Sequence, residues 1–97
     1  MELVSIKKDT ETKKKMVAIF KNKTTGRSKT VRFGADGYTD YTISKDKEKR
    51  ERYLARHKAR ENWSDPTTPG SLSKHILWGD STSIKTNIAD FKKKFKL

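Results

Sequence analysis

Basic side chains without acidic neighbours are the residues in this sequence best placed to do chemistry, and that chemistry is the binding of phosphate. Of the 97 residues, 24 are Lys or Arg and 12 are Asp or Glu, which gives a formal net charge of +12. Such an excess destabilises a compact chain through self-repulsion and is typical of proteins that bind a polyanion. Nucleic acid is the commonest polyanion that proteins of this kind bind.

The positive charge is concentrated at the two ends of the chain. Residues 1–34 carry a net charge of +7, residues 35–66 carry +1 and residues 67–97 carry +4. Two clusters therefore have almost no acidic neighbours, and we predict that both contact nucleic acid. The N-terminal cluster consists of Lys13, Lys14, Lys15, Lys21, Lys23, Arg27, Lys29 and Arg32, and the C-terminal cluster consists of Lys92, Lys93, Lys94 and Lys96.

Lysine outnumbers arginine in both clusters, and this favours one kind of contact. The lysine ammonium is a point charge without the planar fork with which arginine reads base edges. We therefore predict contact with the nucleic-acid backbone and little dependence on base sequence. For either cluster alone, a solvated surface without a partner is the alternative interpretation.

The middle of the chain is charged but balanced. A helix predicted over residues 45–60 holds four arginines and four lysines, together with two i,i+4 pairs in the favourable order, Asp46/Arg50 and Glu48/Arg52. This pattern favours a structural helix with internal salt bridges over direct contact with DNA. Arg56 and Arg60 lie toward its less acidic end, so both interpretations stay open for them, and we include them among the predicted nucleic-acid-binding residues.

The sequence gives little evidence for catalysis. His57 and His75, with Asn62 between them, suggest a His-Asn-His nuclease, whose chemistry needs a metal-bound phosphate and a histidine base. His57 falls in mid-helix beside Tyr53 and Leu54, however, where a structural histidine is the usual occupant. No HxxxH or HxxE spacing and no cysteine is present to build a zinc site. We therefore predict a protein that is not an enzyme and has no cofactor or metal.

A nucleotide-binding loop is not predicted either. Gly34 and Gly37 follow a predicted strand, but the further glycine and the Lys-Ser/Thr of such a loop are missing. Asp36, between the two glycines, would repel phosphate. A tight turn explains the pair better.

The elements that position these residues follow from periodicity. Val4 and Ile6 alternate with polar residues, residues 16–20 form a dense apolar run, and Val31 and Phe33 alternate again. A hairpin turn is predicted over residues 22–26. We therefore predict a three-stranded antiparallel β-meander in residues 1–34, with one packed face.

Three helices are predicted after the meander. Residues 38–44 should form an ordered loop, and Ser44 is the predicted N-cap of the helix over 45–60. A short helix follows from Thr68-Pro69 to Trp78. The last helix, capped by Ser81 or Ser83, has apolar residues at i, i+4, i+7 and i+11, namely Ile84, Ile88, Phe91 and Phe95.

Together these elements predict a single α+β domain over residues 1–97, with a helical part over 45–97. Nine aromatic residues can supply a small core. The longest apolar runs are too short to cross a membrane, and the first residues lack the apolar stretch of a signal peptide. We therefore expect no membrane partner and a location in the cytosol, the nucleus or a particle.

Two signatures are specific enough to carry a resemblance. They are Gly-Tyr-x-Asp-Tyr-Thr over residues 37–42 and Arg-His-x-x-Arg-Glu-Asn-Trp over residues 56–63, flanked by matching segments at 3–6, 33–36, 45–46, 64–66 and 72–78. The sequence resembles the small basic proteins of unknown function that nucleocytoplasmic large DNA viruses, the giant viruses, encode. The resemblance implies a large double-stranded DNA virus and a protein found in the virion and in the host cytoplasm or nucleus.

We therefore expect a non-catalytic, largely sequence-independent protein that binds double-stranded DNA, or RNA, and acts in genome binding or packaging. The alternative is a virion-structural or host-interaction module that binds acidic protein surfaces. In that case the apolar stripe of the last helix would also be a partner surface, for example in a homodimer.

Overall fold

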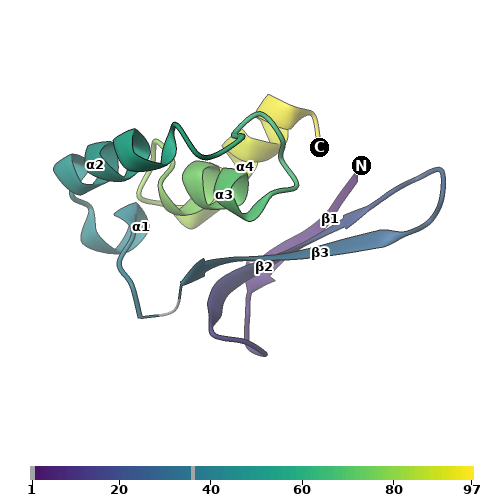
Figure 1. Cartoon of the computed structure of the whole chain (residues 1–97). Coiled ribbons are helices and arrows are strands. Elements are labelled where there is room, and N and C mark those ends of the chain that lie inside the picture. Colours follow the sequence, from purple (N-terminus) through teal and green to yellow (C-terminus); the bar gives the residue numbers. More distant parts are fainter. Residues whose placement is uncertain (1, 36) are drawn as a thin grey trace.

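The computed structural model describes residues 2–35 and 37–97, so Asp36 of the predicted turn lies outside the described residues. Three antiparallel strands in the order β1-β2-β3 form the sheet, with β1 at Glu2–Lys8, β2 at Lys14–Lys21 and β3 at Ser28–Ala35. The helices follow in the sequence and lie on one side of the sheet (Figure 1). The predicted α+β class and β-meander are therefore confirmed.

The core lies between the helices and one face of the sheet. In the register of the sheet, Met16 pairs with Phe33 and Ala18 pairs with Val31, and all four side chains are buried. Phe20 extends this row along the central strand. The helical side of the core consists of Tyr41, Leu72, Ile76, Leu77, Trp78 and Phe91. Apolar and polar residues alternate along the predicted strands, and the apolar side chains form the face that packs in the core.

The first helical region differs from the prediction. The predicted loop over 38–44 contains a one-turn helix, α1 (Tyr41–Ser44), and the next helix, α2, spans Lys47–His57. Its N-cap is Asp46 and not Ser44, because the Asp46 carboxylate accepts the backbone N–H groups of Glu48 and Lys49. Lys45, with φ of 55°, reverses the chain between the two helices. A carboxylate that accepts two N–H groups outcompetes a hydroxyl two residues earlier.

The remaining helices follow the predicted limits with one change. The segment from Thr68 to Trp78 forms α3 (Pro69–Leu72), capped by Thr68, and continues as a π-helical turn, η1 (Ser73–Leu77). Ser83 caps the last helix, α4 (Ile84–Phe95), as predicted. Along α4 Phe91 is buried and Ile88 and Phe95 are half-buried, whereas Ile84 at the start is exposed.

Asn87 is a core residue that the apolar periodicity of the last helix did not predict. Its side chain is 1% exposed and lies on the inner face of α4. Its Nδ2 donates to the carbonyls of Ile76 at 2.8 Å and Ser81 at 2.7 Å, and its Oδ1 accepts the Ser81 N–H at 3.1 Å. A Cβ on Gly79 would lie 2.7 Å from the Asn87 Cγ, so only glycine fits beside it. The amide therefore satisfies carbonyls that the end of η1 and the following loop leave free.

Replacing this amide tests its role. Asn87→Ala leaves the buried carbonyl of Ile76 without a donor, so we expect the free energy of unfolding to fall by about 2–4 kcal/mol. The matched control is Thr86→Ala, at an exposed position of the same helix, which should change it by less than about 0.5 kcal/mol. Urea unfolding measures both, and equal stabilities of the two variants would contradict this role.

The half-buried His75 predicts a pH dependence of stability. His75 packs against Phe91 and Phe95, and burial lowers its pKa from 6.5 to about 4. Between these values the unfolded chain binds a proton that the folded chain excludes, so stability falls as the pH drops from 6.5 to 4. The variant His75→Phe should show a shallower decline over this interval than the wild type in urea unfolding at several pH values. Parallel profiles of the two proteins would show that His75 does not contribute.

Candidate nucleic-acid interface

The turn between β2 and β3 presents the outer part of the N-terminal cluster. The N–H of Asn22 donates to the carbonyl of Arg27 at 2.8 Å, and the Asn22 side chain accepts the N–H groups of Thr24 and Thr25. This hydrogen bonding closes the hairpin, which projects beyond the helices (Figure 1). The side chains of Lys21, Lys23 and Arg27 are exposed. The hairpin thus holds three cations on an ordered turn.

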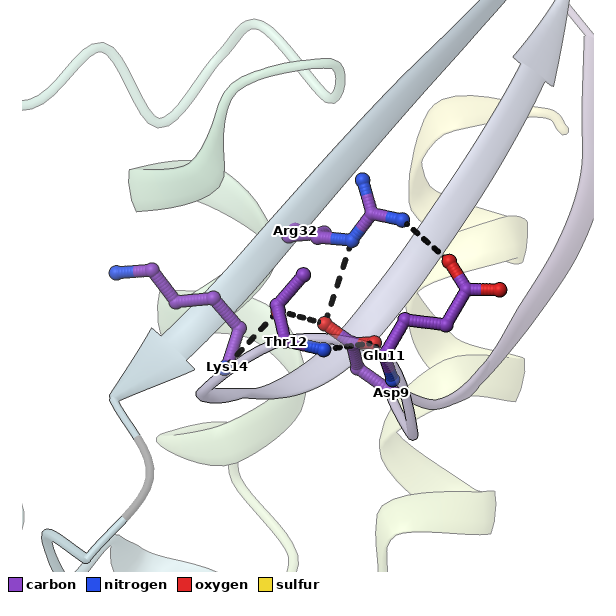
Figure 2. Close-up of polar contacts among 5 residues, drawn as sticks. All are labelled: Asp9, Glu11, Thr12, Lys14 and Arg32. Atoms are coloured by element: carbon purple, nitrogen blue, oxygen red, sulfur yellow. Dashed lines mark hydrogen bonds and ion pairs between the residues drawn. The ribbon is translucent and has the colours of Figure 1, made fainter.

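Arg32 does not belong to the free part of the cluster. Its Nε lies 3.3 Å from the Asp9 carboxylate and its Nη2 lies 3.1 Å from the Glu11 carboxylate (Figure 2). Asp9 is buried, and hydrogen bonds from the Thr12 hydroxyl and from the backbone N–H of Glu11 lower its pKa. Asp9 therefore stays ionised and fixes the guanidinium over the turn between β1 and β2.

Lys15 is also paired. Its Nζ lies 2.7 Å from the carboxylate of Asp40, which is 1% exposed. Asp40 is the N-cap of α1 and accepts the backbone N–H of Thr42 at 2.8 Å. The ion pair joins the central strand to the helical layer, so its role in this structure is to hold the two layers together.

The C-terminal cluster surrounds the end of α4. Lys92, Lys93 and Lys94 lie in the last turn, where the negative end of the helix dipole stabilises cations, and Lys96 closes the helix with φ of 54°. Phe91 anchors this turn in the core, so all four lysine side chains are exposed.

Of the fourteen predicted binding residues, the structure thus pairs Lys15 and Arg32 and leaves twelve exposed. Within residues 2–35 and 37–97, none of the twelve has a carboxylate within 4.0 Å. Lys29 makes one neutral contact, a 3.3 Å hydrogen bond to the Thr67 hydroxyl. The free set consists of Lys13, Lys14, Lys21, Lys23, Arg27, Lys29, Arg56, Arg60, Lys92, Lys93, Lys94 and Lys96.

The prediction of a salt-bridged helix was wrong. Asp46 caps α2 and Arg50 turns away from it, pairing with Asp80 at 2.7 Å and donating Nε to the carbonyls of Trp78 and Gly79. Neither predicted i,i+4 pair is among the ion pairs of the described residues. In the same part of the chain, the only ion pairs of α2 are the one that Arg50 makes and the His57–Glu61 contact at 3.5 Å. Among the described residues, α2 therefore exposes three further cations without a carboxylate within 4.0 Å, Lys47, Lys49 and Arg52. Of these, Arg52 belongs to the predicted pair with Glu48.

The two histidines do not line the same cavity. His57 stacks on Tyr53 at the surface, whereas the half-buried His75 has its Nε2 3.2 Å from the carbonyl of Trp63. Among the described residues, no group of three or more His, Asp or Glu side chains is arranged to hold a metal ion. In the same part of the chain, no helix is long and apolar enough to cross a membrane.

Comparison with known proteins places the chain in a family. Residues 4–57, more than half of the chain, match a family described as a family of unknown function (DUF5754), and the chain belongs to this family. The match covers the sheet except for the first two residues of β1, together with α1 and α2. No curated protein and no solved structure matches the chain.

The Lys15–Asp40 pair is open to a double-mutant cycle. Lys15→Met leaves an uncompensated carboxylate in the core, so we expect a loss of about 3–5 kcal/mol in the free energy of unfolding. Asn can still cap α1, so Lys15→Met combined with Asp40→Asn should recover a large part of that loss. Urea unfolding of the two single variants and the double variant measures the coupling, and additive losses would rule out a direct interaction.

Proposed function

We propose that this protein is a non-catalytic, largely sequence-independent DNA-binding protein that contacts duplex phosphates through its N-terminal and C-terminal clusters. The observation that carries the proposal is the free set: twelve exposed cations with no carboxylate partner among the described residues. Internal pairing of most of these ammonium groups would have removed the reason to expect a polyanionic partner.

The mechanism is neutralisation of phosphates with release of condensed counterions. Lysines on flexible stems suit this role because they accept many phosphate positions and read no base edges. The turn between β2 and β3 projects beyond the paired strands of the sheet and is exposed. This turn would bring Lys21, Lys23 and Arg27 beside the phosphates of the duplex.

The biological setting that we propose comes from the sequence resemblance. A large DNA virus has a long double-stranded genome. A protein that contacts phosphates without base specificity is suited to binding or packaging that genome. We therefore propose association with the virion, and with the host cytoplasm or nucleus during infection. Detection of the protein in purified virions would test this setting, and its absence there would overturn it.

The salt dependence of binding tests the DNA proposal. If six to eight phosphates are contacted, the logarithm of the binding constant should fall with the logarithm of the salt concentration with a slope of about −5 to −7, equally for unrelated duplexes. Neutralising the hairpin in Lys21→Gln/Lys23→Gln/Arg27→Gln should make the slope shallower by about 3. Fluorescence anisotropy with labelled duplexes at several salt concentrations measures both quantities.

A matched control separates specific placement of charge from total charge. Lys7→Gln/Lys8→Gln/Lys85→Gln removes the same three charges at exposed positions outside the free set, so it should change the slope by less than the hairpin variant. Absence of duplex binding at low salt would end the proposal, and cleavage of a plasmid in the presence of magnesium would contradict its non-catalytic part.

A second candidate is a virion-structural or host-interaction module that binds acidic proteins. Exposed apolar side chains favour it: Ile43 is 62% exposed and Ile84 is 37% exposed, and both line one hollow beside the sheet. The remainder of the α4 stripe is packed into the core, so a homodimer would use mainly this patch. Light scattering, together with pull-down that survives nuclease treatment, distinguishes this candidate from DNA binding.

A further inference from the structure

A groove lies between α2 and the loop formed by residues 37–40, which leads to α1. Two adjoining hollows with volumes of about 460 and 480 Å³ form it, and they share Tyr38, Thr39, Arg56 and Trp78. These volumes fall in the range of small-ligand sites. Figure 1 shows α2 and this loop at one end of the molecule and the turn of the hairpin at the other. The groove is thus separate from the hairpin cations.

Aromatic rings line the groove. The Tyr53 ring stacks on Trp78 with a centroid distance of 4.3 Å and an interplanar angle of 5°, and His57 stacks on Tyr53 at 4.2 Å. Tyr38 belongs to the same groove, but its side chain is 74% exposed. A tyrosine in this position offers a free ring face beside a wall of rings that are already stacked.

The loop that carries Tyr38 is held at both ends. Gly37 takes a φ of 85°, and the N–H of Tyr38 donates to the carbonyl of Ala35 at 3.3 Å. Two residues later, Asp40 is fixed by its ion pair with Lys15. The backbone that carries Tyr38 is thus tied to the sheet on both sides, while the side chain itself is exposed beside the groove.

The charge of the groove is positive. Its free cations are Lys14 and Arg56 in the first hollow and Lys49, Arg52 and the same Arg56 in the second. Among the described residues, the two carboxylates of the groove have partners of their own, because Asp40 pairs with Lys15 and Glu61 lies 3.5 Å from His57. A ligand that enters thus meets unpaired cations beside aromatic faces.

We propose that this groove binds a single-stranded segment of nucleic acid, with a base stacked on Tyr38 and the adjoining phosphates held by Arg56, Arg52 and Lys49. Aromatic rings flanked by cations are the combination that single-stranded nucleic acid recognises, since every base has a face for stacking and every nucleotide carries a phosphate. An acidic peptide would use the cations but would leave the exposed ring without a role. The inference rests on the proposed function only in assuming a nucleic-acid partner.

The experiment compares three labelled probes by fluorescence anisotropy: a dT12 strand, an abasic 12-mer with the same phosphates, and a 12-base-pair duplex. The wild-type protein should bind dT12 at least fivefold more tightly than the abasic strand, because stacking adds to phosphate contact. Tyr38→Ala should weaken dT12 binding by about 5- to 100-fold and leave the abasic and duplex affinities unchanged. Tyr38→Phe keeps a ring and should retain the wild-type affinity.

A matched pair of charge variants separates the two sites. Arg52→Gln/Arg56→Gln should lower the affinity for dT12 more than for the duplex, and Lys21→Gln/Lys23→Gln should do the reverse. Duplex binding without preference for dT12 over the abasic strand overturns the groove and leaves the proposed function in place. Tyr38-dependent binding of dT12 without any duplex binding overturns the proposed function and leaves the groove in place. Displacement of dT12 by an equal charge of polyglutamate would also overturn the groove, because it would show that charge alone is recognised.

Discussion

The ion pair between Lys15 and Asp40 is the constraint on which the arrangement of this protein depends. It links the central strand to the start of the helical layer, and Asp40 is nearly inaccessible to water. A buried pair is stable only while both partners are charged and hydrogen-bonded, and the Asp40 carboxylate also accepts the Thr42 N–H. The pair therefore fixes the position of α1 and of the preceding loop. Because Tyr38 lies two residues before Asp40, the same contact constrains the backbone next to the exposed ring.

Scarce carboxylates explain which cations remain free. The chain has half as many acidic as basic residues, and several of those acids occupy junctions between elements. Asp9 fixes the turn between β1 and β2 with Arg32, and Asp80 holds α2 to the end of η1 through Arg50. Asp46 caps α2 and Asp65 accepts the N–H of Thr67. The acids at these junctions are not available to the exposed lysines. Among the described residues, Glu2, Glu48, Glu51 and Asp90 are exposed but have no basic side chain within 4.0 Å. The positive surface thus follows from the excess of basic residues together with the use of several acids inside the fold.

The sequence allowed the strands, the limits of α3 to η1 and the cap of α4 to be predicted, because each depends on local periodicity or on a single capping residue. Other features depend on residues that are distant in the sequence. The partner of Lys15 is 25 residues away, and Asn87 reaches a carbonyl 11 residues earlier. Neither contact leaves a local pattern. Of the predicted binding residues, most are exposed because surface is the default position of lysine. Tyr38 was not predicted, since an aromatic residue in a short sequence is indistinguishable from core until its packing is known.

The distance between the two ends of the molecule bears on what kind of ligand suits it. The protein extends 42 Å along its longest axis, and charges separated by more than the Debye length of about 8–10 Å are largely screened at physiological salt. The hairpin cations and the groove therefore bind almost independently of each other. A small anion gains nothing from the second site, whereas a polymer held at one end is presented to the other at a raised local concentration. Affinity should therefore increase with polymer length until both ends are engaged. This geometry favours a long polyanion over any compact acidic partner that covers one end alone.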